Sequence, residues 1–260
     1  MSTPDRNPQS GAAGARVAAP TGGAFLTERQ DANTVLIPEA FDDDLKMFAQ
    51  TARTFVQREI VPDFAKLEGL DYALSRAKMA TAGGLGLLAV EVPEVYGGLG
   101  AGKAAASVVT EAVAASGSFN VTFNAHVGIG TLPLVYFGTE EQRARYLPRL
   151  ATGEWVAAYC LTEPGSGSDS LAAKARADLD GDEWVLNGTK MWISNAGFAD
   201  LFTVFAQVDG DKFSCFLVEK GAPGLSLGAE EHKMGIKASS TRQVILENVR
   251  VPKGNLLGEI

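Results

Sequence analysis

The spacing of apolar residues changes once along this chain, near Gly153, and that change limits the folds the chain can adopt. Between Pro38 and about Leu150, apolar residues recur every three or four positions, which places them on one face of a helix. After Gly153 they recur at every second position, as in strands with one buried face. We therefore predict an α+β protein, with an N-terminal α-helical bundle followed by a small antiparallel β-barrel domain.

Short turn and capping signals support this division. Asp180-Gly181, Asn187-Gly188 and Asp209-Gly210 each separate two apolar runs, and such pairs are strong indicators of tight hairpins. In the first half, the stretch TEEQ at 139–142 has the spacing of a capping box, which predicts a helix from there to about Leu150.

These patterns divide the chain into three segments. Residues 34–154 form the predicted N-terminal helical domain, and residues 155–260 form the predicted β-barrel domain. Residues 1–33 are predicted to be a disordered tail, because they contain neither an apolar segment of signal-peptide type nor an amphipathic pattern.

The composition argues against several functional classes. The net charge is −8 and charged residues are spread evenly, so no basic stripe indicates a nucleic-acid or anionic-membrane surface. No apolar run approaches the roughly 20 residues that span a bilayer. The two cysteines, Cys160 and Cys215, lie far apart in apolar runs, so we expect buried, reduced thiols. His126 and His232 have no accompanying ligand pattern, and we expect structural or surface histidines.

The stretch CLTEPGSGSDS, residues 160–170, is too rich in glycine and polar residues to be core. It lacks the third glycine of a dinucleotide fingerprint, the lysine of a Walker loop and the residue order of a serine-hydrolase elbow. The acidic residues around Gly181 fit a plain hairpin better than a calcium loop. No nucleophile–base pair is visible, so any chemistry is expected to come from a cofactor.

Three separated blocks, in the expected order, resemble the acyl-CoA dehydrogenase family. They are YCLTEPGSGSD (159–169), NGTKMWISNAGFAD (187–200) and KMGIKASSTRQVILENVRVP (233–252). Residues 140–160 and the GGLG at 97–100 are also similar to that family, and the resemblance covers about Pro38 to Ile260. The stretches KMGIKAS and GGAFL are most similar to the very-long-chain branch.

The resemblance implies a helical domain followed by a β-barrel domain against which FAD lies. It implies an oxidoreductase that takes two hydrogens from the α and β carbons of an acyl-CoA thioester, as in fatty acid β-oxidation, and leaves a trans-2-enoyl-CoA. The hydride goes to the flavin, and the electrons pass to an electron-transfer flavoprotein. The resemblance also implies a homo-oligomer, in the cytoplasm of a bacterium or the mitochondrial matrix of a eukaryote, without nucleic-acid partners or a transmembrane segment.

The first matching block implies flavin contacts after the apolar run that ends near Cys160. Tyr159, Leu161 and Thr162 would line the flavin ring, with the Thr162 hydroxyl on the pyrimidine side. Fixed donors there stabilise the negative charge that reduction places on the ring. Ser168 would touch polar groups of the cofactor or of the acyl-CoA substrate.

The second block implies contacts from the other side of the same site. Trp192 would pack beside the flavin, and the Ser194 hydroxyl would hydrogen-bond at flavin N5. Ile193, between them, completes the set of cofactor-binding residues. No metal ligand is predicted.

No catalytic residue is assigned within these 260 positions. The family's catalytic carboxylate lies in a third, C-terminal helical domain, often in a Tyr/Phe-Glu-Gly-Thr pattern, and this sequence lacks that pattern. Glu163 lies in the flavin loop but is expected to be structural. The chain is therefore expected to be a truncated form, inactive alone. Two alternatives stay open: a non-catalytic flavin- or acyl-CoA-binding partner subunit, and a related acyl-CoA oxidase or flavin monooxygenase.

Overall fold

The computed structural model describes three stretches of the chain: 23–29, 37–210 and 212–260. The chain forms two compact units, residues 1–41 and 42–260. In the first unit, one helical turn, α1, covers Ala24–Thr27 and a 3-10 turn, η2, covers Pro38–Ala40. The predicted disordered tail, 1–33, lies outside the described residues except for 23–29.

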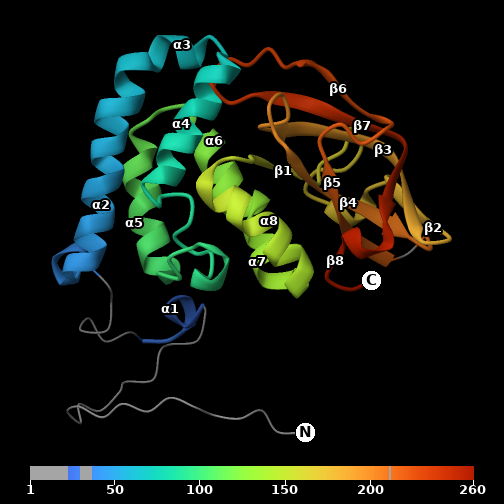
Figure 1. The fold of residues 1–260 in the computed structure, drawn as a ribbon, viewed down its shortest axis with the longest axis horizontal. Helices are drawn as coiled ribbons and strands as arrows, with labels where there is room; N and C mark the ends of the chain where they lie inside the picture. The colour runs from blue at the N-terminus through green and yellow to red at the C-terminus, as the bar shows by residue number, and fades with distance from the viewer. Residues whose placement is uncertain (1–22, 30–36, 211) are drawn as a thin grey trace, which may run out of the picture. The chain divides into compact units, whose positions relative to one another are not determined.

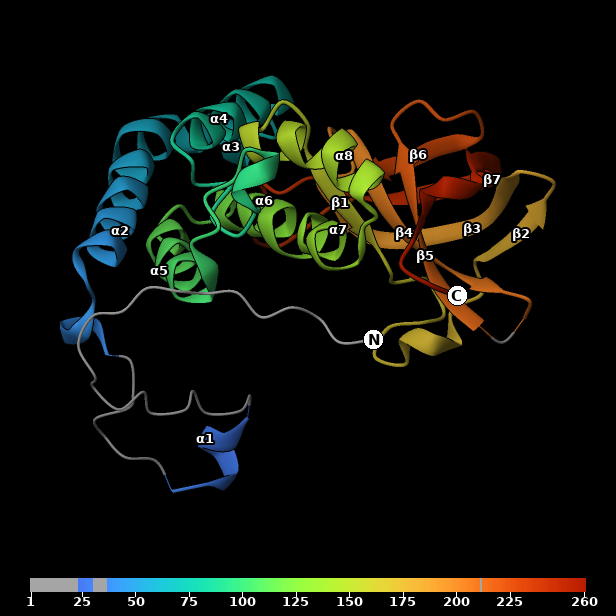
Figure 2. The same cartoon turned by 60° about the horizontal axis from the view of Figure 1, so that its bottom comes forward.

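The second unit begins with a helical half (Figures 1 and 2). The Asp42 carboxylate caps its first long helix by accepting the Leu45 N–H at 2.8 Å. The predicted capping box is confirmed, because Thr139 and Gln142 each accept the other's backbone N–H through a side-chain oxygen. The helices are α2 (Asp43–Phe55), α3 (Phe64–Glu68), α4 (Tyr72–Gly84), α5 (Gly102–Ala114), α6 (Phe119–Asn124), α7 (Leu132–Phe137), α8 (Glu140–Thr152), the π-helices η3 (Val56–Ile60) and η6 (Ala125–Gly130), and the 3-10 turns η4 (Val61–Asp63) and η5 (Glu94–Tyr96).

The second half of this unit is one eight-stranded sheet, joined in the order β6-β7-β3-β2-β4-β5-β8, with β1 beside β4. Most neighbouring strands are antiparallel, as predicted. The strands are β1 (Ala157–Cys160), β2 (Arg176–Asp180), β3 (Glu183–Ser194), β4 (Leu201–Val208), β5 (Lys212–Glu219), β6 (Leu225–Glu230), β7 (Thr241–Pro252) and β8 (Leu256–Leu257).

Two of the three predicted hairpins form. Asp180-Gly181 joins β2 to β3, and Asp209-Gly210 joins β4 to β5. The predicted turn at Asn187-Gly188 was wrong, because both residues lie inside β3 at a shift of register against β7. Gly188 has φ +148°, and a Cβ there would lie 2.6 Å from the Cβ of Ala175. The glycine therefore permits a close approach of two backbones rather than a chain reversal.

One edge of β4 is shared by two strands, and this departs from a purely antiparallel sheet. β1 pairs in parallel with residues 201–204 of β4, and β2 makes one parallel contact farther along, between Arg176 and Gln207. The chain forms β1 on this edge of β4, leaves the sheet after Cys160, and returns to the same edge as β2. Residues 161–175 therefore form a loop that starts and ends on that edge. Within the described stretches, the end strands β6 and β8 do not pair, so strand pairing does not close the predicted barrel.

Apolar packing joins the two halves. One core cluster lies mainly among the helices and a second mainly among the strands. A third contains residues of both, including Tyr146 and Leu147 of α8 and Leu201 of β4. Polar contacts add to this junction: Arg76 of α4 pairs with Asp200 at 2.7 Å, and the Tyr72 hydroxyl donates to Glu230 at 2.6 Å.

His126 is a buried structural histidine, as the sequence predicts. Its side chain is fully buried in η6, where Nε2 lies 3.0 Å from the Leu150 carbonyl and Nδ1 accepts the Ala157 N–H at 3.0 Å. These partners require a neutral ring with its proton on Nε2. Burial lowers the pKa of His126 from 6.5 to about 4, although the Leu150 carbonyl and Asp200 favour the charged form.

This burial predicts acid sensitivity. The unfolded chain binds a proton at His126 near pH 6.5 and the folded chain only near about pH 4, so stability falls as pH drops through that interval. The loss from this group is about 3 kcal/mol. Urea unfolding at pH 7 and pH 4.5 should show a smaller pH effect for His126→Gln than for wild type. The exposed His232→Gln variant should keep the wild-type effect.

Two glycines of η6 provide a matched test of packing. A Cβ on Gly130 would lie 2.7 Å from the Cβ of Ala157 in β1, whereas a Cβ on Gly128 would meet nothing within 4 Å. Gly130→Ala is expected to lower the free energy of unfolding by about 1–3 kcal/mol through overpacking. Gly128→Ala is expected to raise it by about 0.4–1 kcal/mol by restricting the unfolded chain. Equal effects in urea titrations would contradict this account.

Candidate functional site

The loop of residues 161–175 is held in a compact shape by its own polar groups. Glu163 and Ser166 exchange two backbone hydrogen bonds of 2.9 and 3.1 Å, and the Ser166 hydroxyl donates to the Asp169 carbonyl at 2.8 Å. A 3-10 turn, η7 (Ser170–Ala172), follows. Ser168 is exposed on this loop, and its hydroxyl has no hydrogen-bond partner among the described residues.

Glu163 is an anchor of the loop and not a free carboxylate. It accepts hydrogen bonds from Lys190 Nζ at 2.7 Å, from the Lys174 N–H at 2.6 Å and from the Ala175 N–H at 3.0 Å. Burial raises the pKa of the Glu163 carboxyl, but these three donors outweigh burial and hold the pKa below its usual range. A carboxylate so stabilised is a poor general base, in agreement with the structural role expected for it.

The structure brings together two of the segments that the sequence singles out. The Met191 N–H donates to the Thr162 carbonyl at 2.8 Å, and Lys190 Nζ donates to the Leu161 carbonyl at 3.1 Å. Leu161 and Thr162 are therefore adjacent to the strand that carries Trp192. Both residues are half-buried.

Trp192 has an unusual backbone and an exposed ring. Its φ is +61°, which is strained for a bulky side chain, and the β3–β7 pairing shifts between Lys190 and Ile193. As a result Trp192 is 54% exposed, while the next residue, Ile193, is 2% exposed and belongs to the core of the sheet. Ile193 can contact a ligand only through its backbone.

The hydroxyl groups of Thr162 and Ser194 complete this region. Ser194 is half-buried and pairs with Thr241 of β7. Among the described residues, neither hydroxyl has a hydrogen-bond partner. Hydroxyl donors on the two segments that the Met191–Thr162 hydrogen bond joins, together with the exposed indole ring of Trp192, are chemically suited to a planar, polar-edged ligand.

An open cavity of about 800 Å³ lies beside β1, β5 and the segment 257–259. The Tyr159 ring lines it, with its centroid 5.0 Å from that of Phe205, which stacks on Phe213 at 5.7 Å. Among the predicted site residues, only Tyr159 lines this cavity in the described part of the chain.

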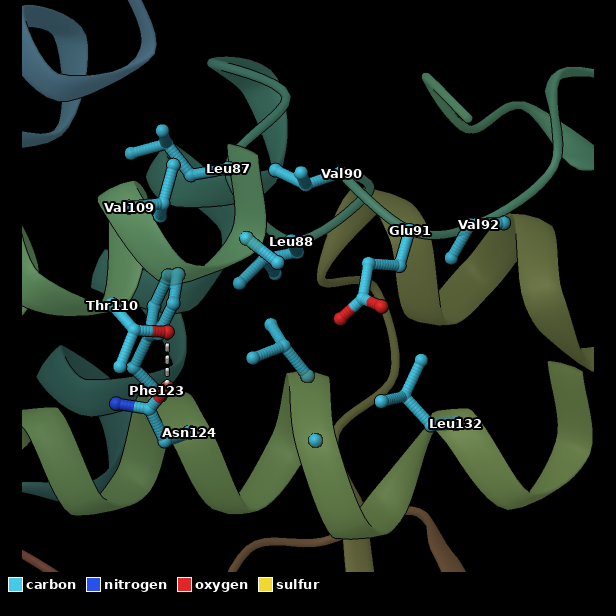
Figure 3. Close-up of a pocket in the computed structure, with 13 residues that line it drawn as sticks. Leu87, Leu88, Val90, Glu91, Val92, Val109, Thr110, Phe123, Asn124 and Leu132 are labelled. Atoms are coloured by element: carbon cyan, nitrogen blue, oxygen red, sulfur yellow. Dashed lines mark hydrogen bonds between the residues drawn. The ribbon is translucent and has the colours of Figure 1, made fainter. Parts of the chain in front are cut away.

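A second cavity, of about 90 Å³, lies within the helical half between the segment 87–92, α5, α6 and η6. Figure 3 shows the Glu91 carboxylate directed into the space between Leu88 and Leu132. The Thr110 hydroxyl donates to Asn124 Oδ1 at 3.1 Å on another side. The cavity has room for only a small ligand and shares no lining residue with the segments described above.

The remaining expectations concern cysteines, metals and membranes. Cys160 and Cys215 are buried and free, as predicted. Around Gly181, Arg250 pairs with Asp180 at 2.7 Å and Glu183 at 3.2 Å, as suits a plain hairpin. In the ranges that the structure describes, no group of three or more potential ligands could hold a metal ion. Every helix in those ranges is too short or too polar to cross a bilayer.

Lys190 and Asn195 were not among the predicted site residues, yet both make buried polar contacts near the site. Lys190 occupies an inward position of β3, two residues after Gly188 and two before Trp192, and its side chain is 0% exposed. A lysine in phase with the buried residues of a strand is the signal that could have found it, since a buried lysine needs a partner. Asn195, with φ +65°, donates from Nδ2 to the Thr122 carbonyl at 3.0 Å, and nothing in the local sequence indicates that distant partner.

Two family descriptions match the chain. "Acyl-CoA dehydrogenase, N-terminal domain" matches residues 42–154, and "Acyl-CoA dehydrogenase, middle domain" matches residues 158–249. The two spans correspond to the helical half and to most of the sheet.

Similar proteins carry the same family name. A probable acyl-CoA dehydrogenase of Bacillus subtilis is 52% identical over 92% of this chain and 41% of its own length. The short-chain specific mitochondrial acyl-CoA dehydrogenase of Mus musculus is 40% identical over 82% of this chain and 53% of its own. A crystal structure of an acyl-CoA dehydrogenase complexed with FAD, from Bacillus anthracis, is 51% identical, with a TM-score of 0.89, over 92% of this chain and 41% of that chain.

The chain thus spans about half the length of these relatives. Both family descriptions, the fold and the relatives agree, and the chain belongs to the acyl-CoA dehydrogenase family, with its N-terminal and middle domains.

Proposed function

We propose that this chain supplies the flavin-facing part of an FAD-dependent acyl-CoA dehydrogenase. The observation that carries the proposal is the meeting of Thr162 with the strand of Trp192 and Ser194, through the Met191–Thr162 hydrogen bond of 2.8 Å. This bond joins the segment that carries the Thr162 hydroxyl to the strand that carries the exposed Trp192 ring and the Ser194 hydroxyl. The FAD in the Bacillus anthracis relative supports the same assignment.

The residues of the chain would hold the cofactor in distinct ways. The Thr162 and Ser194 hydroxyls would donate to polar edges of the ring, and Trp192 would pack against it. Leu161 would contribute an apolar contact, and Ile193 its backbone. When bound, FAD supplies the two-electron oxidation of the acyl thioester.

Tyr159 and Ser168 have separate proposed roles. Tyr159 belongs to the aromatic wall of the 800 Å³ cavity, and we assign it to the far end of the cofactor surface. Ser168, exposed on the loop, would bind polar groups of FAD or of the acyl-CoA.

We assign no catalytic base among these residues. The Glu163 carboxylate is engaged by Lys190 and two backbone N–H groups, so it is not available to remove a proton. Turnover is proposed to require residues that the relatives carry outside the matched span. Electron-transfer flavoprotein as acceptor, homo-oligomeric assembly, and a cytoplasmic or mitochondrial-matrix location are proposals of the same kind, as is the division into domains 34–154 and 155–260.

The proposed kinship with the very-long-chain branch rests on the resemblance at 22–26 and 233–239. The relatives do not single out that branch, and one of them is short-chain specific.

The first test is cofactor retention. The purified 260-residue chain, mixed with FAD and freed of the excess, is expected to keep the visible absorption band of bound flavin. Adding an acyl-CoA should not bleach that band, because the Glu163 carboxylate is engaged by Lys190 and two backbone N–H groups and we assign no other catalytic base. Failure to retain flavin would contradict the proposal. Bleaching followed by oxygen consumption would favour an oxidase or monooxygenase, and a co-purifying helical subunit would favour the partner-subunit alternative.

The second test removes individual contacts. Thr162→Val and Ser194→Ala should each raise the FAD dissociation constant by roughly 3- to 10-fold, the equivalent of about 1 kcal/mol for one hydrogen bond. Trp192→Ala should weaken binding further by removing the packing surface. Thr54→Val, on α2, removes a hydroxyl elsewhere, one that accepts from Gln50 Nε2 at 3.2 Å, and should leave the dissociation constant unchanged. Equal binding by all four variants would show that the flavin lies elsewhere.

A further inference from the structure

A lysine and a glutamate are buried together beside the loop 161–175. The side chains of Lys190 and Glu163 are 0% and 7% exposed, and Nζ lies 2.7 Å from Oε1. Removing two charges from water is costly, and an apolar pair of similar volume is often at least as stable. Stability therefore does not explain the pair, and its role lies in what it holds in place.

The Glu163 carboxylate ties the two ends of the loop to each other. It belongs to the start of the loop, and it accepts the backbone N–H groups of Lys174 and Ala175 at the end, at 2.6 and 3.0 Å. The exposed stretch between these ends contains Ser168. The Glu163 side chain thus fixes the distance between the two ends of the loop.

Lys190 ties that loop to β3. Its Nζ donates both to Glu163 and to the Leu161 carbonyl at 3.1 Å, while the next residue, Met191, holds the Thr162 carbonyl. The register shift that turns Trp192 outward begins at Lys190. The lysine is therefore the point at which the loop and the strand are fixed relative to one another.

We propose that Lys190 and Glu163 are positioning residues, which set the distance between the 161–162 segment and Trp192 so that a flavin fits between their contacts. This proposal rests on the proposed function above. Neither side chain touches the cofactor in this account, and both act through the backbone groups that they hold.

The test compares single and double substitutions in the 260-residue chain. Lys190→Met and Glu163→Gln each remove one charge, and the double variant removes both and leaves the local net charge unchanged. The double variant is expected to fold, since neutral replacement of a buried pair is often tolerated. The control is Lys78→Met with Glu59→Gln, a partly buried pair of 3.1 Å in the helical half. FAD binding, amide hydrogen exchange without FAD, and the urea midpoint are measured for each.

The double variant is expected to bind FAD at least tenfold more weakly than wild type, with a urea midpoint close to that of wild type. The amides of Lys174 and Ala175 should exchange at least tenfold faster, since their acceptor is weakened. The control variant, Lys78→Met with Glu59→Gln, should change neither the FAD affinity nor the exchange rates of the Lys174 and Ala175 amides. Glu163→Asp keeps the negative charge but has a side chain shorter by one methylene, so we expect an intermediate loss of FAD affinity. This variant replaces the double variant in the test if the double variant does not fold.

Two results would overturn the proposal. One is a double variant, or Glu163→Asp if the double variant does not fold, that binds FAD within twofold of wild type. The other is tighter FAD binding by Glu163→Gln alone. That result would mean that Lys190 affects FAD binding through its positive charge and not by fixing the loop against β3. If wild type binds no FAD, the proposed function itself fails, and the exchange rates then report only on the loop.

Discussion

The backbone of Ala157, the first residue of β1, is bound by side chains from both halves of the molecule. Its N–H donates to Nδ1 of His126 at 3.0 Å, and its carbonyl accepts from Nδ2 of Asn195 at 3.3 Å. A buried peptide group without partners is costly, so the first residue of β1 depends on these side chains. His126 is in turn bound to Leu150 at the end of α8, and Asn195 to Thr122 of α6. The helices thereby fix where the sheet begins.

The position of β1 then determines the geometry of the candidate site. Because β1 occupies the first part of one β4 edge and β2 the later part, the chain between them has to leave the sheet. Glu163 and Lys190 bind the departing loop back to β3, next to the outward-turned Trp192. Helix packing, strand pairing and a buried ion pair thus together determine where the loop 161–175 and Trp192 lie. The strain at Trp192, with φ +61°, lies where these constraints meet.

Local signals in the sequence predicted local structure well. The capping box at 139–142 and the turns at Asp180-Gly181 and Asp209-Gly210 depend on residues close in the chain, and all three formed. Asn187-Gly188 carries the same signal as a turn, but Ala175, from a different part of the chain, decides its conformation.

The candidate site shows the same limit. The glycine-rich stretch and the block around Trp192 could be singled out from their composition and family resemblance. Their adjacency, and the two parallel pairings of β4, could not, because they depend on contacts between distant parts of the chain. Asn195 could not be found for the same reason, since its partner Thr122 lies far away in sequence. For Lys190, the pattern of the strand indicates burial, but its partner Glu163 lies on another segment.

The shared edge of β4 has a consequence for how such a protein can diverge. A loop that leaves and rejoins the same edge of one strand can change in length or composition without shifting the register of any strand pair. The anchors Glu163 and Ala175 lie near its two ends, and Lys190 of β3 holds Glu163. Between those ends, Gly165 and Gly167 have open space where a side chain would begin. Ligand preference can therefore be altered here by small steps, each leaving the sheet intact.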